Sequence, residues 1–176
     1  MSVGFFTFSR LDNLLPKTSN LSSLRYLTRS DLQLHADGLL VQFRSSKTNQ
    51  LGDRTLNVPL ASLSIPICPV QAVTNMFRCS PSHPSAPAFS YNISSNTFFF
   101  LQNSFIATLR SFLSHLGFDA QSFSSMRRGG ATQAFRSGVP GELIKSHGDW
   151  TSEAYLTYLE LSHSQKLQVS RTMAHH

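Results

Sequence analysis

The stretch Met126-Arg127-Arg128-Gly129-Gly130-Ala131-Thr132 carries the densest functional signal in this sequence. It predicts a helix from about Met126 to Arg136 with both arginines in the first turn. Guanidinium groups beside the free backbone N–H groups of a helix N-terminus favour a phosphate ligand. Each glycine costs such a helix about 1 kcal/mol relative to alanine, which is tolerated where something must pack closely. The alternative interpretation is a basic surface turn whose glycines permit helix–helix packing.

On the C-terminal side of this stretch, Gly148-Asp149-Trp150 leads into a predicted helix from about Thr151 to Leu161. Trp150 is the only tryptophan of the chain. Tyr158 lies two turns further on, and a tyrosine hydroxyl is a nucleophile when its attack is electrostatically assisted. Tyr155 competes for that role from a neighbouring helix face, about 60° away. Most helical tyrosines are instead amphipathic residues at the edge of a core.

On the N-terminal side, Arg10 lies on a predicted, largely apolar helix from Gly4 to Leu15, where a guanidinium needs a partner. An ion pair with Asp12 or Asp31 is the alternative to a functional role. Asp37-Gly38 between apolar runs indicates a hairpin. The sheet predicted around it is antiparallel and has three strands, Asp31–His35, Leu39–Arg44 and Thr55–Leu60. The polar connection Ser45–Asp53 carries Lys47, for which a solvated charge is the alternative.

Further helices are predicted at Pro69–Cys79 and Asn103–Leu116, and a short one follows the break at Gly138-Val139-Pro140 and runs to His147. The order of a helix, a small sheet and then mostly helices predicts an α+β domain dominated by helix. A length of 176 residues corresponds to one domain.

Composition narrows the class of protein. The 15 Lys and Arg against 9 Asp and Glu give a net charge of +6, a balance that permits a polyanion partner. Two cysteines are too few for a disulfide scaffold or a cysteine-based zinc site. No run approaches 18 apolar residues and no signal-peptide pattern is present, so we expect an intracellular protein with no membrane partner.

In combination, Arg10, Lys47, Arg127, Trp150 and Tyr158 resemble, in order and spacing, the catalytic residues of the tyrosine recombinases. Arg10 stands at the arginine of the family's first box, Lys47 at the β-hairpin lysine, and Arg127 at the last residue of His-x-x-Arg. Trp150 matches the His/Trp position and Tyr158 the nucleophile. The wording Arg-Arg-Gly-Gly-Ala-Thr, Gly-Asp-Trp and Ala-Tyr-Leu-Thr-Tyr is closest to the DIRS-like, Ngaro-like and Crypton-like mobile-element recombinases of eukaryotes. The resemblance runs from Phe5 to about Glu160.

The resemblance implies the catalytic core of the DNA breaking-rejoining enzymes, an α+β fold with a small three-stranded antiparallel sheet. It implies cleavage and rejoining of double-stranded DNA through a 3′-phosphotyrosyl link to Tyr158, in DNA recombination and integration. Arg10 and Arg127 would clamp the scissile phosphate and Arg128 would bind DNA phosphate. Lys47 would be the general acid and Trp150 an N–H donor. No metal ion, nucleotide or other cofactor is implied, and the expected assembly is a tetramer on DNA in the nucleus.

Three departures from the family pattern stand beside these expectations. Ser124 occupies the position of the histidine in His-x-x-Arg, and serine cannot transfer protons near neutral pH as histidine does. His147 is an alternative source of an imidazole, and Asn13 replaces the glutamate of the first box. The N-terminal DNA-clamping domain usual in the family is expected to be absent from residues 1–176. The rival interpretations are a DNA-binding relic without turnover and a helical protein–protein scaffold with no nucleic-acid role.

Overall fold

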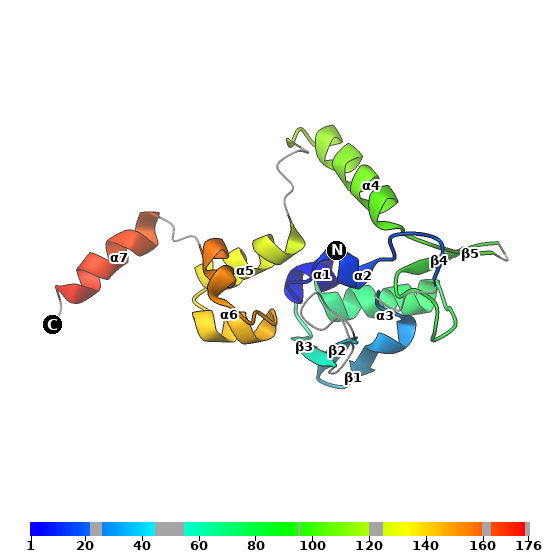
Figure 1. Cartoon of the computed structure of the whole chain (residues 1–176), viewed down its shortest axis with the longest axis horizontal. Coiled ribbons are helices and arrows are strands. Elements are labelled where there is room, and N and C mark those ends of the chain that lie inside the picture. Colours follow the sequence, from blue (N-terminus) through cyan, green and yellow to red (C-terminus); the bar gives the residue numbers. More distant parts are fainter. Residues whose placement is uncertain (22–25, 45–54, 95, 120–124, 160–162, 175–176) are drawn as a thin grey trace.

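The computed structural model describes residues 1–21, 26–44, 55–94, 96–119, 125–159 and 163–174. The chain has an α+β fold in which helices outnumber strands (Figure 1). Two short helices, α1 (Ser2–Phe6) and α2 (Leu11–Leu14), precede a 3-10 turn, η1 (Arg29–Asp31), and the sheet. No helix in the described part of the chain is long and apolar enough to cross a membrane.

The predicted three-stranded sheet is present. It consists of β1 (Leu32–His35), β2 (Gly38–Phe43) and β3 (Leu56–Ala61), antiparallel and in that spatial order. His35 pairs with Gly38 across the two-residue turn, so the Asp-Gly signal located the hairpin correctly. The connection between β2 and β3 includes residues 45–54 and therefore Lys47, which lies outside the described residues.

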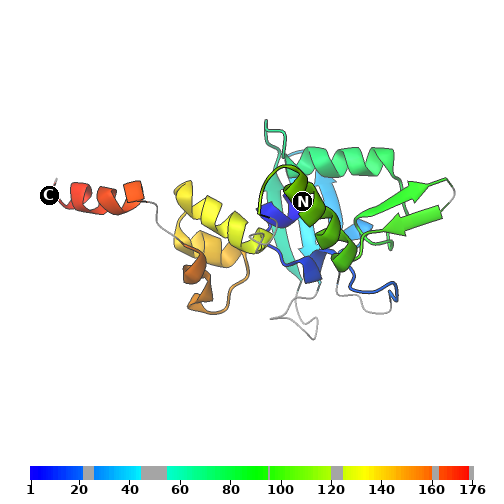
Figure 2. The same ribbon diagram turned by 90° about the horizontal axis from the view of Figure 1, so that it is seen from above.

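A large core lies between the sheet and α3 (Pro69–Cys79), which matches its predicted bounds (Figure 2). Side chains alternate along β3, where Val58 and Leu60 are buried and their neighbours are exposed. Val41 from β2 and Val73 from α3 complete the centre of this core. Period-two alternation against a helix stripe explains why both elements could be predicted.

A smaller core joins α5 (Met126–Arg136), α6 (Gly141–His147) and the 3-10 turn η3 (Glu153–Tyr158). Its buried members are Phe8, Ala131, Ile144 and Tyr155. Helix α5 serves both cores, because Met126 at its start belongs to the large core and Ala131 to the small one. The stretch Met126–Thr132 thus joins the large core to the small one.

The predicted helix Gly4–Leu15 was wrong in its continuity, since α1 and α2 are separated at residues 7–10. Phe8 has a φ of 50°, a left-handed conformation that an α-helix cannot include. The hydroxyl of Thr7 donates to the carbonyl of Val3 at 2.8 Å, and its oxygen lies 2.7 Å from Ser9 Oγ, whose hydroxyl can donate to it. Such side-chain hydrogen bonds compete with helix continuation.

The predicted helix Thr151–Leu161 was also wrong, because η3 is a 3-10 turn. The ring of Trp150 lies 6.1 Å from that of Tyr155 and 6.0 Å from that of Tyr158. Residues i and i+3 eclipse in a 3-10 turn, so both tyrosines reach one indole, whereas an α-helix would turn them apart.

Two further helices and a hairpin of two strands complete the described part of the chain. Helix α4 (Gln102–His115) confirms the predicted amphipathic helix to within one residue at each end. The hairpin of β4 (Ser90–Ile93) and β5 (Asn96–Phe99) and the helix α7 (His163–Met173) were not predicted. Figure 1 shows α7 standing apart from the rest of the molecule.

Candidate functional site

Four of the five candidate catalytic residues line one pocket of about 290 Å³. Arg10 comes from the α1–α2 connection, Arg127 from the start of α5, Trp150 from the segment after α6, and Tyr158 from the end of η3. Phe43, the last residue of β2, also lines this pocket, as does Leu56, the first residue of β3. The connection between them carries the fifth candidate, Lys47, outside the described residues.

Arg10 is exposed and takes the N-cap position of α2 in an extended conformation. The expected alternative was an ion pair with a nearby carboxylate, but those carboxylates have other partners. Asp12 pairs with Lys17 at 2.8 Å and Asp31 with Arg44 at 2.7 Å. Within the described residues, no ion pair holds Arg10, so its guanidinium is available to a ligand in the pocket.

Arg127 is held by its surroundings on two sides. Its Nη1 donates to the backbone carbonyl of Phe8 at 2.9 Å, and its guanidinium carbon lies 3.8 Å from the centroid of the Trp150 ring. Its Nε is buried without a hydrogen-bond partner in the described structure. A fixed guanidinium with an unused donor is suited to an anionic oxygen.

The electrostatic environment of Arg127 is unusual for a guanidinium. Burial is the main cause that lowers its pKa to about 10, and the nearby charge of Arg10 lowers it further, while Tyr158 and Asp149 act in the opposite direction. Desolvation and a like charge both disfavour the protonated form. An anion entering the pocket would relieve both effects.

The turn that carries the two arginines is capped by Ser125. Its hydroxyl oxygen accepts from the backbone N–H groups of Arg127 at 3.1 Å and Arg128 at 3.5 Å. Ser125 therefore occupies two of the N–H groups that were expected to be free at this helix end, which leaves the guanidinium groups as the main source of phosphate affinity. Arg128 is exposed, with its guanidinium carbon 6.0 Å from the ring centroid of Tyr158. Ser124 lies outside the described residues.

Two glycines allow the close contacts that build this site. A Cβ on Gly130 would lie 2.2 Å from the backbone oxygen of Phe5 and 2.6 Å from the ring of Phe8. A Cβ on Gly148 would lie 1.7 Å from the Trp150 ring. Of the pair Gly129-Gly130, the interpretation as a close-packing contact is thus correct for Gly130. The same helix also places Arg127 in the pocket.

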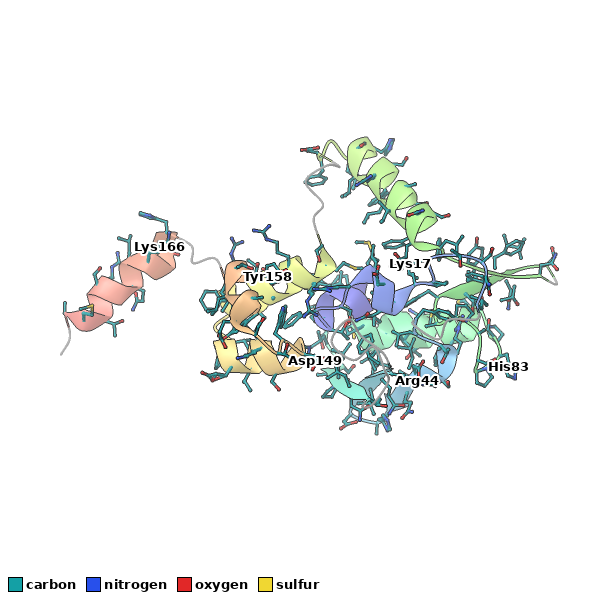
Figure 3. The ribbon with its side chains drawn as sticks, viewed as in Figure 1. Lys17, Arg44, His83, Asp149, Tyr158 and Lys166 are labelled. Atoms are coloured by element: carbon teal, nitrogen blue, oxygen red, sulfur yellow. The ribbon has the colours of Figure 1, made fainter. Side chains whose placement is uncertain are left out.

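The two tyrosines have different environments. Tyr155 is buried in the small core, where desolvation raises the pKa of its hydroxyl, and it does not line the pocket. Tyr158 is half-buried and lines the pocket. Figure 3 shows Tyr158 next to α5, and Asp149 on the side of α6 that faces α1 and the sheet. Of the two, Tyr158 is the tyrosine placed beside Arg10 and Arg127.

His147 is not brought into this pocket. Its Nε2 donates to the backbone carbonyl of Phe6 at 2.7 Å, and its ring lies 4.8 Å from the ring of Phe8. It lines a separate, larger apolar pocket of about 700 Å³ between β3, α5 and α6. Within the described residues, no group of three or more His, Cys, Asp or Glu side chains could hold a metal ion.

Two contributors to the site were not identified from the sequence. The carbonyl of Phe8 orients Arg127, and no sequence pattern marks a backbone acceptor of this kind. Thr132 ends the quoted motif, and its hydroxyl donates to the backbone carbonyl of Tyr158 at 2.6 Å. Because Thr132 lies on the same helix as Arg127, the sequence could have identified it as a residue near the site.

Comparison with solved structures identifies the fold. The chain resembles XerH site-specific recombinase bound to palindromic difH substrate in a post-cleavage complex, with a TM-score of 0.60, 13% identity, and coverage of 96% of this chain and 43% of that one. The pre-cleavage complex of XerH with difH gives a TM-score of 0.58, 12% identity, and coverage of 96% and 44%. The fold is that of the tyrosine recombinase catalytic domain, as predicted.

This chain spans less than half of the length of those recombinase chains. No family model matches the sequence. No curated protein matches it either.

Proposed function

We propose that this chain is the catalytic domain of a tyrosine recombinase that cleaves and rejoins double-stranded DNA without a metal ion or nucleotide cofactor. The observation that carries the proposal is the shared pocket of Arg10, Arg127, Trp150 and Tyr158, residues separated by up to 148 positions in the sequence. Two guanidinium groups beside a tyrosine hydroxyl form a set suited to phosphoryl transfer.

In the proposed reaction, the Tyr158 oxygen attacks the scissile phosphorus and its proton leaves to solvent. The bond from phosphorus to the 5′-oxygen breaks, which leaves a 3′-phosphotyrosyl link and a 5′-hydroxyl. Arg10 and Arg127 stabilise the charge that develops on the non-bridging oxygens. Lys47 protonates the leaving 5′-oxygen, and the indole N–H of Trp150 donates to the phosphate. Religation to another strand reverses these steps and needs no external energy source.

Trapping on a nicked suicide DNA substrate tests this proposal. Wild type is expected to form a covalent protein–DNA adduct that Tyr158→Phe does not form. Tyr155→Phe is the matched control, since it removes the same hydroxyl from a buried tyrosine outside the pocket. Adducts that persist in Tyr158→Phe and disappear in Tyr155→Phe would reverse the assignment.

The role of Lys47 has its own chemical test. A 5′-thiolate is a much better leaving group than an alkoxide, because a thiol has a pKa of about 8.5 and needs no general acid. Lys47→Ala is therefore expected to cleave ordinary DNA poorly and a 5′-thio substrate at nearly the wild-type rate. Equal loss on both substrates would assign Lys47 a role other than proton donation.

Ser124 favours a second candidate function, a DNA-binding relic of such an enzyme. Serine at this position leaves the proposed site without the proton-transferring histidine of the family pattern. The relic interpretation predicts that wild type binds DNA and never forms an adduct, while Ser124→His does. Adduct formation by wild type would exclude it.

DNA binding itself distinguishes both of these from a protein–protein scaffold. With a net charge of +6, binding that uses phosphate contacts releases counterions from the DNA, and this release is less favourable at higher salt, so binding must weaken as salt rises. A plot of log K against log salt is expected to have a clearly negative slope. A slope near zero would support the scaffold.

We also propose that the protein assembles as a tetramer on DNA and that α7 contacts the adjacent copy. This helix lies apart from the body, and its Leu167 and Met173 are 42% and 74% exposed. Leu167→Glu is expected to lower the mass of the DNA complex in light scattering. Gln168→Glu, the same charge on an exposed neighbour, is expected to leave the mass unchanged.

The wording of the motifs supports an origin in a eukaryotic mobile element of the DIRS-like, Ngaro-like or Crypton-like groups, with integration of that element as the biological reaction. A DNA substrate in a eukaryotic cell places the proposed site of action in the nucleus. Fluorescent tagging of the chain tests that location directly.

A further inference from the structure

Helix α5 makes a second connection to the pocket beyond Arg127. Thr132 lies on the same helix, is half-buried, and donates its hydroxyl hydrogen to the backbone carbonyl of Tyr158 at 2.6 Å. This hydrogen bond joins two residues 26 positions apart and crosses from α5 to η3. It reaches the main chain of the candidate nucleophile itself.

We propose that Thr132 is a positioning residue that sets the place of the Tyr158 hydroxyl relative to the two arginines. The inference rests on the proposed function, since it assigns a role toward the nucleophile of that reaction. Thr132 does not line the pocket, so it acts through the backbone of Tyr158 and not on the DNA.

The local structure explains why Tyr158 needs such an anchor. The turn η3 is a 3-10 helix of 6 residues, and Leu159 follows it with non-helical angles, φ −88° and ψ 71°. The last carbonyl groups of a helix lack partners within it, and 3-10 hydrogen bonds are themselves of poor geometry. The hydroxyl of Thr132 supplies a partner for the carbonyl at the end of the turn.

Helix α5 thereby acts as a common support for the three charged or reactive groups. It carries Arg127 directly, and Arg127 binds the carbonyl of Phe8, two residues before Arg10. The absence of a side chain at Gly130 lets the helix approach α1, and Ala131 is fully buried in the small core. Thr132 forms the hydrogen bond to η3. Consecutive residues of one rigid element thus fix the α1–α2 connection, the small core and the tyrosine turn.

Phosphoryl transfer requires that the attacking oxygen sit in line with the leaving oxygen at near-contact distance. A misplacement of about 1 Å costs about 100-fold in rate in well-ordered sites. Releasing the Tyr158 carbonyl is therefore expected to lower the cleavage rate about 10- to 100-fold while leaving DNA affinity intact.

The test compares Thr132→Val, Thr132→Ser and Thr157→Val with wild type. Valine keeps the shape of threonine and removes the hydroxyl, and serine restores the hydroxyl. Thr157→Val is the matched control, because the Thr157 hydroxyl donates at 2.8 Å to Ala154 within the same turn and does not join it to α5. The readouts are single-turnover adduct formation, DNA affinity, melting temperature and amide hydrogen exchange across residues 153–158.

The expected result is slow cleavage and faster amide exchange in Thr132→Val alone, with DNA affinity unchanged and Thr132→Ser close to wild type. Wild-type cleavage by Thr132→Val would overturn the inference. Parallel losses of melting temperature, DNA affinity and rate that serine fails to restore would show a merely structural residue and also overturn it. If wild type forms no adduct, the proposed function fails first, and the positioning role fails with it.

Discussion

The two sides of the candidate pocket are built differently. The arginine side is continuous with buried structure, since Arg127 binds the Phe8 carbonyl and lies against Trp150, and Gly130 brings α5 into contact with α1. The tyrosine side is a 3-10 turn whose connections to α5 include one side-chain hydrogen bond from Thr132. Arg127 is therefore held by contacts of its own guanidinium, whereas the tyrosine turn is held by the packing of its rings in the small core and by a hydrogen bond to the backbone of Tyr158.

This difference has a chemical rationale. Electrostatic stabilisation works best when donors are fixed before charge develops, because no energy is then spent on reorganisation. A nucleophile that must become covalently attached to DNA and be released again has to move with the phosphorus. Substitutions on the arginine side should therefore strongly affect the rate of DNA cleavage or the stability of the fold. Substitutions on the tyrosine side should affect the position of the Tyr158 hydroxyl.

Arg127→Gln is expected to have the largest effect, a loss of about 100- to 1,000-fold in adduct formation, because it removes a fixed donor to the transition state. Folding stability should change little, since loss of the hydrogen bond to the Phe8 carbonyl and of the contact with Trp150 is offset by removal of a partly buried charge whose Nε has no partner in the described structure. Suicide-substrate trapping and urea denaturation measure the two quantities. Arg136→Gln, at the exposed end of the same helix, controls for the loss of one positive charge.

Gly130→Ala tests whether the arginine side depends on close packing. The new Cβ would meet the backbone oxygen of Phe5 at 2.2 Å, and overpacking of this kind costs about 1–3 kcal/mol even after the gain in helix propensity. Gly129→Ala is the matched control, because its Cβ would meet only the Phe5 ring at 3.7 Å. Urea denaturation should show a loss for Gly130→Ala and no loss for Gly129→Ala. Similar values for both would contradict the packing argument.

Trp150→Phe probes the residue that touches both sides, because its ring lies over Arg127 and 6.0 Å from Tyr158. Phenylalanine keeps an aromatic face, is a weaker partner for a cation, and lacks the indole N–H. The expected loss of folding stability is about 1 kcal/mol. Trp150→His separates the role of an N–H donor to the phosphate from that of an aromatic partner for Arg127. Histidine supplies an N–H donor but a smaller aromatic face, so adduct trapping reports on the donor role.

The sequence predicted the elements whose pattern is local. Helices α3, α5 and α6 and the sheet follow from apolar periodicity, from Pro69 at a first turn and from Asp-Gly in a hairpin. The set of pocket residues followed from a family resemblance, because nothing local in the chain brings Arg10 near Tyr158.

The two wrong predictions, a continuous helix over Gly4–Leu15 and an α-helix over Thr151–Leu161, fall where side-chain packing overrides the local preference for helix. Phe8 adopts a φ of 50° in a segment whose apolar periodicity is helical. Tyr155 and Tyr158 pack against the indole of Trp150 from a 3-10 turn where an α-helix was predicted. Phe8 packs against His147 and Trp150, more than a hundred residues away, whereas the rings of Tyr155 and Tyr158 pack around Trp150 within one short segment. Neither has a signature in the residues that surround it.

The smallest expected effect concerns the repulsion between the two arginines. Arg127 has a pKa of about 10, well below the ordinary value of a guanidinium, chiefly because it is partly buried. Its charge therefore costs folding stability at every pH below about 10, and this cost is relieved as pH rises above about 10, because the folded protein then loses the proton before the unfolded chain does. Arg10 contributes to that cost through its like charge.

Arg10→Gln should thus raise the free energy of unfolding at pH 7.5 by about 0.5 kcal/mol, the size typical of an exposed charge interaction. High salt should shrink the gain, since the repulsion passes partly through solvent. Arg110→Gln, which removes another exposed arginine on α4 outside the pocket, should give no such gain. If both variants gained equally, the benefit would come from lower net charge, and Arg10 and Arg127 would not be held against one another. A gain confined to Arg10→Gln, together with slower DNA cleavage, would show that the pocket keeps an unfavourable charge pair that an entering phosphate relieves.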